Sequence, residues 1–225
     1  MTATMQPTSF ARQPLDAILS GTGSVRILRA LAAHGGALSV SRLAADTNMT
    51  PNGTRGVLND LEQTGVVEAL GDGRTKLFRL KAAHPLAATL EYLFAAERSR
   101  FDSILYAIEG ATKDNRITSV WLFGSVARSE DTCRSDLDIA ILVNAAPDEV
   151  ERITDIVREA LHEHEKRIGF TASVVAMHTA DVRDLIRQRA PLWSDLLRDA
   201  QVIKGPPPDR VARELEATTT PAGRA

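Results

Sequence analysis

The chain has 225 residues, of which 44% are hydrophobic and 25% charged, and its formal net charge is −2. This length suffices for two domains of about 100 residues each, and the composition is ordinary for a soluble globular protein. No apolar run approaches the roughly 20 residues that a membrane span requires, and the first ten residues lack the apolar segment of a signal peptide. The single cysteine, Cys133, excludes an internal disulfide and agrees with a reducing cytoplasm.

Both ends of the chain have a composition that favours disorder. Residues 1–14 and 205–225 are rich in Pro, Thr, Ala and charged residues, and they contain few large apolar side chains. Such segments bury too little apolar surface to offset the entropy lost on ordering. We therefore expect a disordered N-terminus over residues 1–14 and a disordered tail over residues 205–225.

Three helices are predicted in the first third of the chain. The first covers Val25 to His34, and Ser39 caps a short second helix. Thr50-Pro51 begins the third helix, which runs to about Gln63, because a capping residue is followed there by proline at the first helical position. Three helices in this order predict a helix-turn-helix. Four residues of the third helix are expected to face outward: Asn52, Thr54, Arg55 and Asn59.

Two short strands follow the third helix. Residues 66–70 and 76–80 flank the turn-forming Gly71-Asp72-Gly73-Arg74, which is typical of a β-hairpin. Over residues 15–84 the chain thus resembles the winged helix-turn-helix DNA-binding domain of bacterial regulators. The resemblance implies that the third helix enters the major groove of double-stranded DNA and that the wing contacts phosphate or the minor groove. It assigns DNA contacts to Thr50, Asn52, Thr54, Arg55, Asn59, Arg74 and Lys76.

The charge of this region agrees with DNA binding but leaves another interpretation open. Residues 1–84 contain nine Lys or Arg and six Asp or Glu, so the region is mildly basic. Affinity for DNA depends on the number of phosphates that are neutralised. The domain could instead bind a protein, with Asn52 and Arg55 on a solvated helix face. Gly53 and Gly56 also lower the intrinsic propensity of the third helix.

A connecting helix is predicted over residues 85–112. Its large apolar residues recur at nearly continuous helical spacing; they are Leu86, Leu90, Leu93, Phe94, Phe101, Ile104, Leu105 and Ile108. This stripe could form the seam of a homodimer, since winged helices often bind two half-sites. Core packing within the chain explains the stripe equally well.

The second half of the chain contains a strand-loop-strand unit with two polar motifs. An apolar run that ends in Phe123 stops at Gly124-Ser125, as expected for a buried strand that opens into a tight loop. Gly124 would let the backbone approach a phosphate, and Ser125 with neighbouring N–H groups could bind the anion. A second strand begins at Asp136, and ten residues separate it from Ser125.

The second strand carries two acidic residues at its start. Because side chains alternate along a strand, Asp136 and Asp138 project from the same face. Two carboxylates at this spacing suit divalent cations, and hard oxygen ligands next to a phosphate site indicate Mg²⁺ or Mn²⁺. Without a cation the two carboxylates would raise each other's pKa.

These motifs resemble the signature of the minimal nucleotidyltransferases, within the polymerase-beta-like superfamily. The matching residues are Phe123-Gly124-Ser125-Val126-Ala127-Arg128 and Ser135-Asp136-Leu137-Asp138. The resemblance implies transfer of a nucleoside monophosphate from ATP or another nucleoside triphosphate to an acceptor, with Mg²⁺ bound by Asp136 and Asp138. By position, Gly124, Ser125, Arg128 and Ser135 would bind the nucleotide, although Arg128 fits a surface arginine equally well.

The chain departs from the resembled family on the third strand, predicted at residues 170–177. The family usually has a third acidic residue there, whereas this chain has Ser173 at the matching position. A serine cannot act as a general base in place of a carboxylate. Asp181, Asp184 and Glu165 are the alternative acids, but solvated helix charges explain them better.

We therefore expect an α+β protein with an N-terminal winged helix-turn-helix over residues 15–84, a connecting helix over residues 85–112 and a nucleotidyltransferase-fold domain with a small mixed sheet over residues 113–204. The first functional hypothesis is a cytoplasmic DNA-binding nucleotidyltransferase, as in an autoregulating antitoxin that transfers AMP to a cognate toxin. The alternative is a transcription regulator whose degenerate transferase domain senses a nucleotide or contacts a protein.

Overall fold

The structure is a computed structural model that describes residues 9–72 and 76–219. The chain divides into two compact units between Ser99 and Arg100, and each unit has its own hydrophobic core. Helix α5 (Ala87–Ala111) contributes residues to both units. Among the helices of the described residues, none is both long and apolar enough to cross a membrane.

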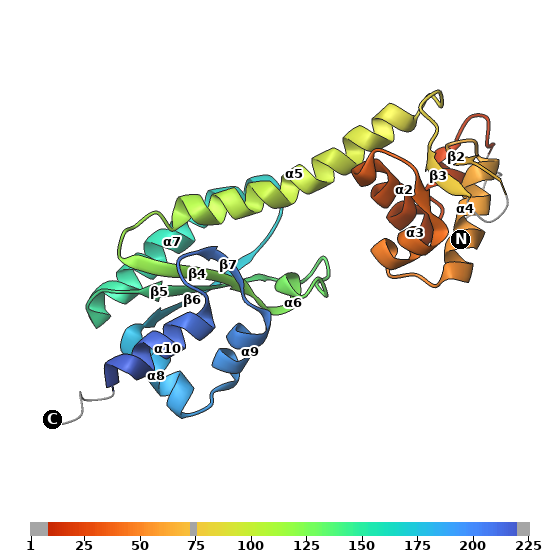
Figure 1. Ribbon diagram of the computed structural model, residues 1–225. Helices are drawn as coiled ribbons and strands as arrows, with labels where there is room; N and C mark the ends of the chain where they lie inside the picture. Colours follow the sequence, from red (N-terminus) through yellow and green to blue (C-terminus); the bar gives the residue numbers. More distant parts are fainter. Residues whose placement is uncertain (1–8, 73–75, 220–225) are drawn as a thin grey trace, which may run out of the picture. The chain divides into compact units, whose positions relative to one another are not determined.

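The N-terminal unit combines short helices with one small sheet (Figure 1). Before α5 its elements are α1 (Leu15–Ile18), α2 (Thr22–His34), β1 (Leu38–Ser39), α3 (Val40–Thr47), α4 (Pro51–Gln63), β2 (Val67–Leu70) and β3 (Leu77–Leu80). The antiparallel sheet has the order β1-β3-β2. Strands β2 and β3 form the predicted hairpin, and the two-residue strand β1 is an addition that the sequence pattern did not indicate.

Two polar side chains fix the starts of α3 and α4, as predicted. The Ser39 hydroxyl accepts a hydrogen bond from the Arg42 N–H at 3.2 Å, and the Thr50 hydroxyl accepts one from the Gly53 N–H at 3.1 Å. Such caps contribute about 1 kcal/mol each. Asn48, with φ of 51°, makes the turn between the two helices.

The first half of α5 belongs to the core of the N-terminal unit. Leu90 and Phe94 are each 3% exposed and belong to the same core cluster as residues of the four preceding helices. Leu93, however, is 52% exposed, because it is turned by about 100° from Phe94 on the helix. The predicted apolar stripe is therefore partly core and partly surface.

The C-terminal unit is built on a four-stranded mixed sheet. After α5 its elements are β4 (Ile117–Phe123), α6 (Gly124–Ala127), β5 (Leu137–Val143), α7 (Pro147–Ile168), β6 (Ala172–His178), α8 (Thr179–Arg187), α9 (Pro191–Asp199), β7 (Gln201–Lys204) and α10 (Pro208–Thr219). The strand order is β6-β5-β4-β7. Strands β5 and β6 are parallel, and the other two pairs are antiparallel.

The two faces of this sheet are covered by different helices (Figure 1). Helices α5 and α7 pack on the face that includes Leu137, Ile139 and Ile141. Helices α8, α9 and α10 pack on the opposite face, where Trp121 and Ala140 are fully buried. Since alternate residues of a strand point to opposite faces, Asp138 lies on the side of Ala140. The predicted α+β class is thus observed.

The predicted disordered tail is wrong for residues 208–219, which form α10. Val211 is 4% exposed and packs in the same cluster as Trp121 and Trp193. The Trp121 indole also donates a hydrogen bond to the Pro206 carbonyl at 2.9 Å. Val211 and Leu215 recur at i and i+4, so the segment is an amphipathic helix. Its overall composition, rich in Pro, Thr and Ala, did not indicate this.

The predicted disorder of the N-terminus also needs correction. Residues 9–13 of the predicted disordered N-terminus form a turn, in which the Arg12 and Gln13 N–H groups donate to the Ser9 carbonyl; residues 1–8 lie outside the described part of the chain. Helix α8 begins after its N-cap residue, His178. Its ring nitrogen accepts the Ala180 N–H at 3.1 Å.

Candidate functional site

The predicted phosphate-binding bend lies at the end of β4, where α6 begins. Gly124 has φ of 75°, a conformation that side-chain-bearing residues rarely adopt. A Cβ atom on this residue would lie 2.3 Å from the Asp138 Oδ2 atom. The Gly-Ser bend and the Asp138 carboxylate are therefore in contact distance, and only glycine fits between them.

Strand β5 places Asp138 next to this bend, and Asp136 directly precedes the strand. Asp138 pairs with Phe123 across the β4–β5 ladder, so its carboxylate lies beside the start of α6. Asp136 immediately precedes β5 and is exposed. Partial burial, and then the negative charge of Asp136, raise the pKa of Asp138, whereas the positive charge of Arg128 lowers it. The two carboxylates thus interact electrostatically.

Ser173, which the sequence resemblance matches with the third acid of the nucleotidyltransferases, lies in β6. In the parallel ladder between β5 and β6, Asp138 is paired directly with Ser173. The three alternative acids are engaged locally: Glu165 accepts the Ala172 N–H at 2.7 Å, Asp181 accepts the His178 N–H at 2.8 Å and Asp184 pairs with Arg187. None of these contacts involves the carboxylate pair.

These residues can accommodate a divalent cation with few protein ligands. Within residues 9–72 and 76–219, no cluster of three His, Cys, Asp or Glu side chains suitable for a metal is found. Mg²⁺ is commonly held by one or two carboxylates together with substrate phosphates and waters. Asp136 and Asp138 supply two hard oxygen ligands whose mutual repulsion a cation would relieve. The donor set therefore fits Mg²⁺ or Mn²⁺ bound with a nucleotide.

Arg128 is held by two carboxylates at the end of α6. Its guanidinium donates to Glu130 and to Asp199, each at 2.7 Å. The Asp199 side chain is only 5% exposed and is also bound by Arg198. The amide of Gln201 donates to the Ala127 carbonyl at 2.8 Å. Residues of α9 and β7 thus anchor α6, a role that the local sequence motif did not reveal.

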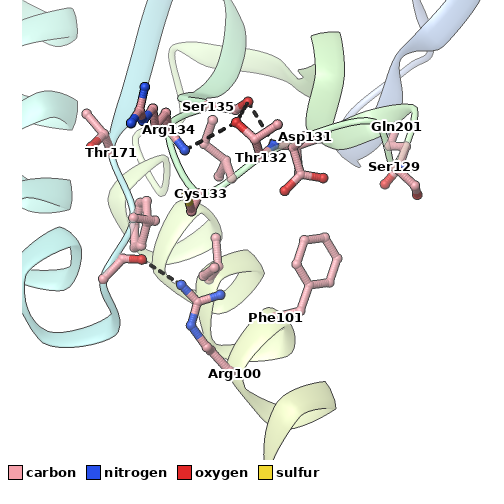
Figure 2. Close-up of a pocket in the computed structure, with 15 residues that line it drawn as sticks. Arg100, Phe101, Ser129, Asp131, Thr132, Cys133, Arg134, Ser135, Thr171 and Gln201 are labelled. Carbon is pink, nitrogen blue, oxygen red and sulfur yellow. Dashed lines mark hydrogen bonds between the residues drawn. The ribbon is translucent and has the colours of Figure 1, made fainter. Parts of the chain in front are cut away.

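The loop between the two motifs borders a separate cavity of about 970 Å³ (Figure 2). The cavity lies between this loop, the Arg100–Ile104 segment of α5 and the turn between α7 and β6. Its lining includes Ser135 and Leu137 but neither of the two aspartates. The Ser135 hydroxyl accepts the Thr132 N–H at 3.0 Å, so it also stabilises the loop. Because Leu137 and Asp138 point to opposite faces, the cavity is distinct from the carboxylate site.

Three of the four residues that were predicted to face outward from α4 are exposed. Asn52, Arg55 and Asn59 are exposed, and Arg55 donates a hydrogen bond to the Asn52 side chain at 3.0 Å. The prediction that Thr54 faces outward is wrong, because Thr54 is fully buried. It shares the core face with Leu58, one turn later, and its hydroxyl donates to the Thr50 carbonyl at 3.0 Å.

Of the predicted wing residues, Lys76 is engaged within the chain. It forms an ion pair with Glu62 of α4 at 3.1 Å and lies 5.2 Å from the centre of the Phe78 ring. Its ammonium group would have to leave Glu62 to bind a phosphate. Arg74 lies outside the described residues. Thr50 is exposed, but its hydroxyl is used as the cap of α4.

Two protein family models match the chain, one in each half. Residues 107–190 match the family model described as polymerase beta, nucleotidyltransferase. Residues 24–71 match the IclR helix-turn-helix domain. These matches confirm both resemblances. No curated protein matches the sequence of the chain.

Several solved structures are similar to parts of the chain. The winged helix-turn-helix domain of a possible ArsR-family transcriptional regulator from Mycobacterium bovis is 24% identical, over 43% of this chain and 91% of that one, with a TM-score of 0.32. A toxin-antitoxin structure with AMP-PNP is 16% identical, over 51% and 85% of the two chains, with a TM-score of 0.33. At these TM-scores the likenesses identify no function. The family matches, together with the fold, show that the chain joins an IclR-type helix-turn-helix domain to a nucleotidyltransferase domain of the polymerase beta family.

Proposed function

We propose that the protein is a cytoplasmic, DNA-binding nucleotidyltransferase. Its C-terminal unit would transfer a nucleoside monophosphate, with AMP favoured, from a nucleoside triphosphate to a protein or another acceptor. Its helix-turn-helix would bind double-stranded DNA and regulate transcription. An autoregulating antitoxin that modifies a cognate toxin is the specific role that we favour, and this role predicts a protein partner.

The contact between the Gly124 bend and Asp138 carries the enzymatic part of this proposal. A phosphate-binding bend and a metal-binding carboxylate can act in one reaction only if both contact the same nucleoside triphosphate. A Cβ atom on residue 124 would lie 2.3 Å from the Asp138 Oδ2 atom, so the two groups are neighbours. The first turn of α6 has no side-chain cap from Phe123, and uncapped N–H groups at a helix start attract anions.

The chain's own residues would act mainly by binding and orienting. Ser125 and the backbone after Gly124 would hold the triphosphate, and Asp136 and Asp138 would hold the cation. A bound Mg²⁺ would neutralise charge on the phosphates and on the leaving pyrophosphate. The acceptor atom would then bond to the α-phosphorus while the bond to the pyrophosphate breaks, and the acceptor's proton would pass to water. Positioning and electrostatics supply most of the catalysis in phosphoryl transfer reactions.

Ser173 supports a second candidate function. A missing third carboxylate removes a general base, whose contribution is typically about 10²–10⁴-fold. Since Glu165 and Asp181 are engaged elsewhere, neither replaces it in this conformation. Under this alternative the protein is a winged-helix regulator whose C-terminal unit binds a nucleotide, or a protein, without transferring a group.

Label transfer distinguishes the two candidates. The full chain would be incubated with α-³²P-labelled ATP, Mg²⁺ and the product of the neighbouring gene, beside an Asp136→Ala/Asp138→Ala double variant and an Asp148→Ala control. Asp148 is an exposed acid in the first turn of α7. Label that transfers with the wild type and the control, but not with the double variant, supports the transferase. Equal background in all three, with nucleotide binding retained by the wild type, favours the regulator.

The exposed residues of α4 support the DNA-binding part of the proposal. In a helix-turn-helix, the N-terminal residues of the second helix of the motif contact base edges, and Asn52 and Arg55 occupy such positions in α4. Arg55→Ala should weaken specific binding by about 1–3 kcal/mol. Arg42→Ala, which removes an exposed arginine of α3 that pairs with Asp46, is the control. Equal affinities of the two variants would contradict the assignment of α4 to DNA.

A further inference from the structure

Gly56 lies at the centre of the outward face of α4. The core side of this helix is set by Thr54, Leu58 and Leu61, which are at most 1% exposed. At about 100° per residue, Gly56 points almost directly away from these three residues. Asn52 and Asn59 flank it one turn before and about one turn after, and both are exposed. The centre of the polar face is therefore bare backbone.

The fold of the N-terminal unit gives no reason for a glycine at this position. Gly56 lies within a regular helix, and among the described residues no heavy atom comes within 4 Å of a Cβ built on it. Gly53 is different, because a Cβ there would lie 3.1 Å from the capping Thr50 hydroxyl. A glycine inside an exposed helix is unfavourable relative to alanine. Gly56 thus lowers stability without relieving any contact within the described chain.

We propose that Gly56 is the point at which α4 comes closest to the base edges in the major groove of DNA. This inference rests on the proposed DNA binding and adds the residue that sets the depth of docking. A missing side chain lets the backbone of the helix approach a surface closely. A methyl group at Gly56 would hold the helix away from the base pairs, so that flanking side chains would reach the bases less well.

The neighbouring polar groups are arranged for such an approach. Arg55 and Asn52 are already hydrogen-bonded to each other, so their side chains are partly ordered before binding. Asn and Arg form the bidentate contacts that distinguish adenine and guanine in the major groove. The acidic residues Asp60 and Glu62 lie beyond Asn59, towards the end of α4. The N-terminal half of the helix is therefore the part suited to a polyanion.

The test compares two glycine-to-alanine substitutions in the full chain. Gly56→Ala is the test variant, and Gly110→Ala is its matched control, because Gly110 is also an exposed glycine in a helix with no described heavy atom within 4 Å of an added Cβ. The DNA probe is the duplex that the wild type selects from a pool with a randomised central segment. Melting temperature, affinity and the salt dependence of affinity are measured for all three proteins.

We expect both variants to melt at or above the temperature of the wild type, and only Gly56→Ala to lose affinity for the selected duplex. A loss of about tenfold or more corresponds to one bidentate base contact. The slope of affinity against salt should stay unchanged, because phosphate contacts are retained. Unchanged affinity of Gly56→Ala, or a lower melting temperature of that variant, would overturn the inference. Failure of the wild type to select any duplex would instead refute the proposed DNA binding itself.

Discussion

Ser173 lies directly opposite Asp138 in the parallel pairing of β5 and β6. Paired residues of neighbouring strands point to the same face of a sheet. We therefore expect an acid at this position to stand beside Asp138, at the place that the sequence resemblance assigns to the third acid. We propose that the lack of this acid would make the C-terminal unit a slow transferase or a unit that only binds its ligand.

Ser173→Asp should make the stability of the C-terminal unit depend more strongly on Mg²⁺. Three neighbouring carboxylates repel one another, so the variant should melt below the wild type in EDTA, and added Mg²⁺ should recover the difference. Ser173→Asn is the control of similar shape without the charge. Thermal melting with EDTA and with Mg²⁺ measures the effect. The same Mg²⁺ response in the Asp and Asn variants would show that residue 173 does not face the site.

Gly124→Ala should lower the free energy of unfolding more than Gly169→Ala, a substitution at another glycine with a positive φ. A left-handed conformation of a non-glycine residue costs about 1–3 kcal/mol, and the new Cβ would in addition lie 2.3 Å from the Asp138 carboxylate. Gly169→Ala isolates the backbone effect, because Gly169 has φ of 74° with no described heavy atom within 4 Å of an added Cβ. Urea unfolding gives the free energies. Equal losses for the two variants would mean that residue 124 and Asp138 are not in close contact.

Asp199→Asn should weaken the anchor of α6 in a pH-dependent way. Hydrogen bonds from Arg198, and then from Arg128, lower the pKa of Asp199 to about 2, against about 3.9 in an unfolded chain. A lowered pKa stabilises the folded state above the unfolded pKa, and the stabilisation disappears as the pH falls through the folded pKa. The difference in melting temperature between wild type and variant should therefore be complete above about pH 5 and shrink towards pH 2.

Asp195→Asn is the control for this pH dependence. Asp195 also pairs with Arg198, but its side chain is 43% exposed, and ion pairs at exposed sites contribute little. A variant with Asn at 195 should melt close to the wild type at every pH. If the difference in melting temperature between the wild type and Asp199→Asn stayed the same from pH 7 to pH 2, the effect of the substitution would come from packing rather than from charge.

Val211→Ala should destabilise the C-terminal unit, because α10 is part of its core. Removal of two buried methyl groups costs about 1–2 kcal/mol, and Val211 packs in the cluster of Trp121 and Trp193. Val202→Ala is the control, since Val202 is 45% exposed and surface substitutions usually change stability by less than about 0.5 kcal/mol. Chemical unfolding followed by tryptophan fluorescence measures both. A loss for Val211→Ala no larger than for Val202→Ala would mean that α10 does not pack there.

The sequence predicted the elements that depend on local rules. Ser39 and Thr50 cap helices where their positions indicated, and the apolar runs around Phe123 and Ile139 form the strands β4 and β5. Local signals of this kind act within a few residues, so they can be recognised without the fold. The two family resemblances depended on such short motifs as well.

The features that the sequence did not predict depend on contacts between distant segments. Asp199 and Arg128 are 71 residues apart, and no local pattern connects them. Residues 208–219 form a helix because Val211 is buried in the same cluster as Trp121. The proline-rich start of this segment had indicated disorder. The Thr54 hydroxyl donates its hydrogen bond to the Thr50 carbonyl within the helix, so the side chain can be buried. Its polarity alone had led to the wrong prediction of an exposed position.

The central claim is that the Gly124 bend and the aspartate pair bind one nucleoside triphosphate together with a divalent cation. Equilibrium dialysis of the full chain with labelled ATP tests this claim most directly, with Mg²⁺ or EDTA and with the Asp136→Ala/Asp138→Ala variant. We predict saturable binding by the wild type in Mg²⁺ that falls strongly in EDTA and in the double variant. Binding that is equal in all of these conditions, or absent from the wild type, would contradict the account.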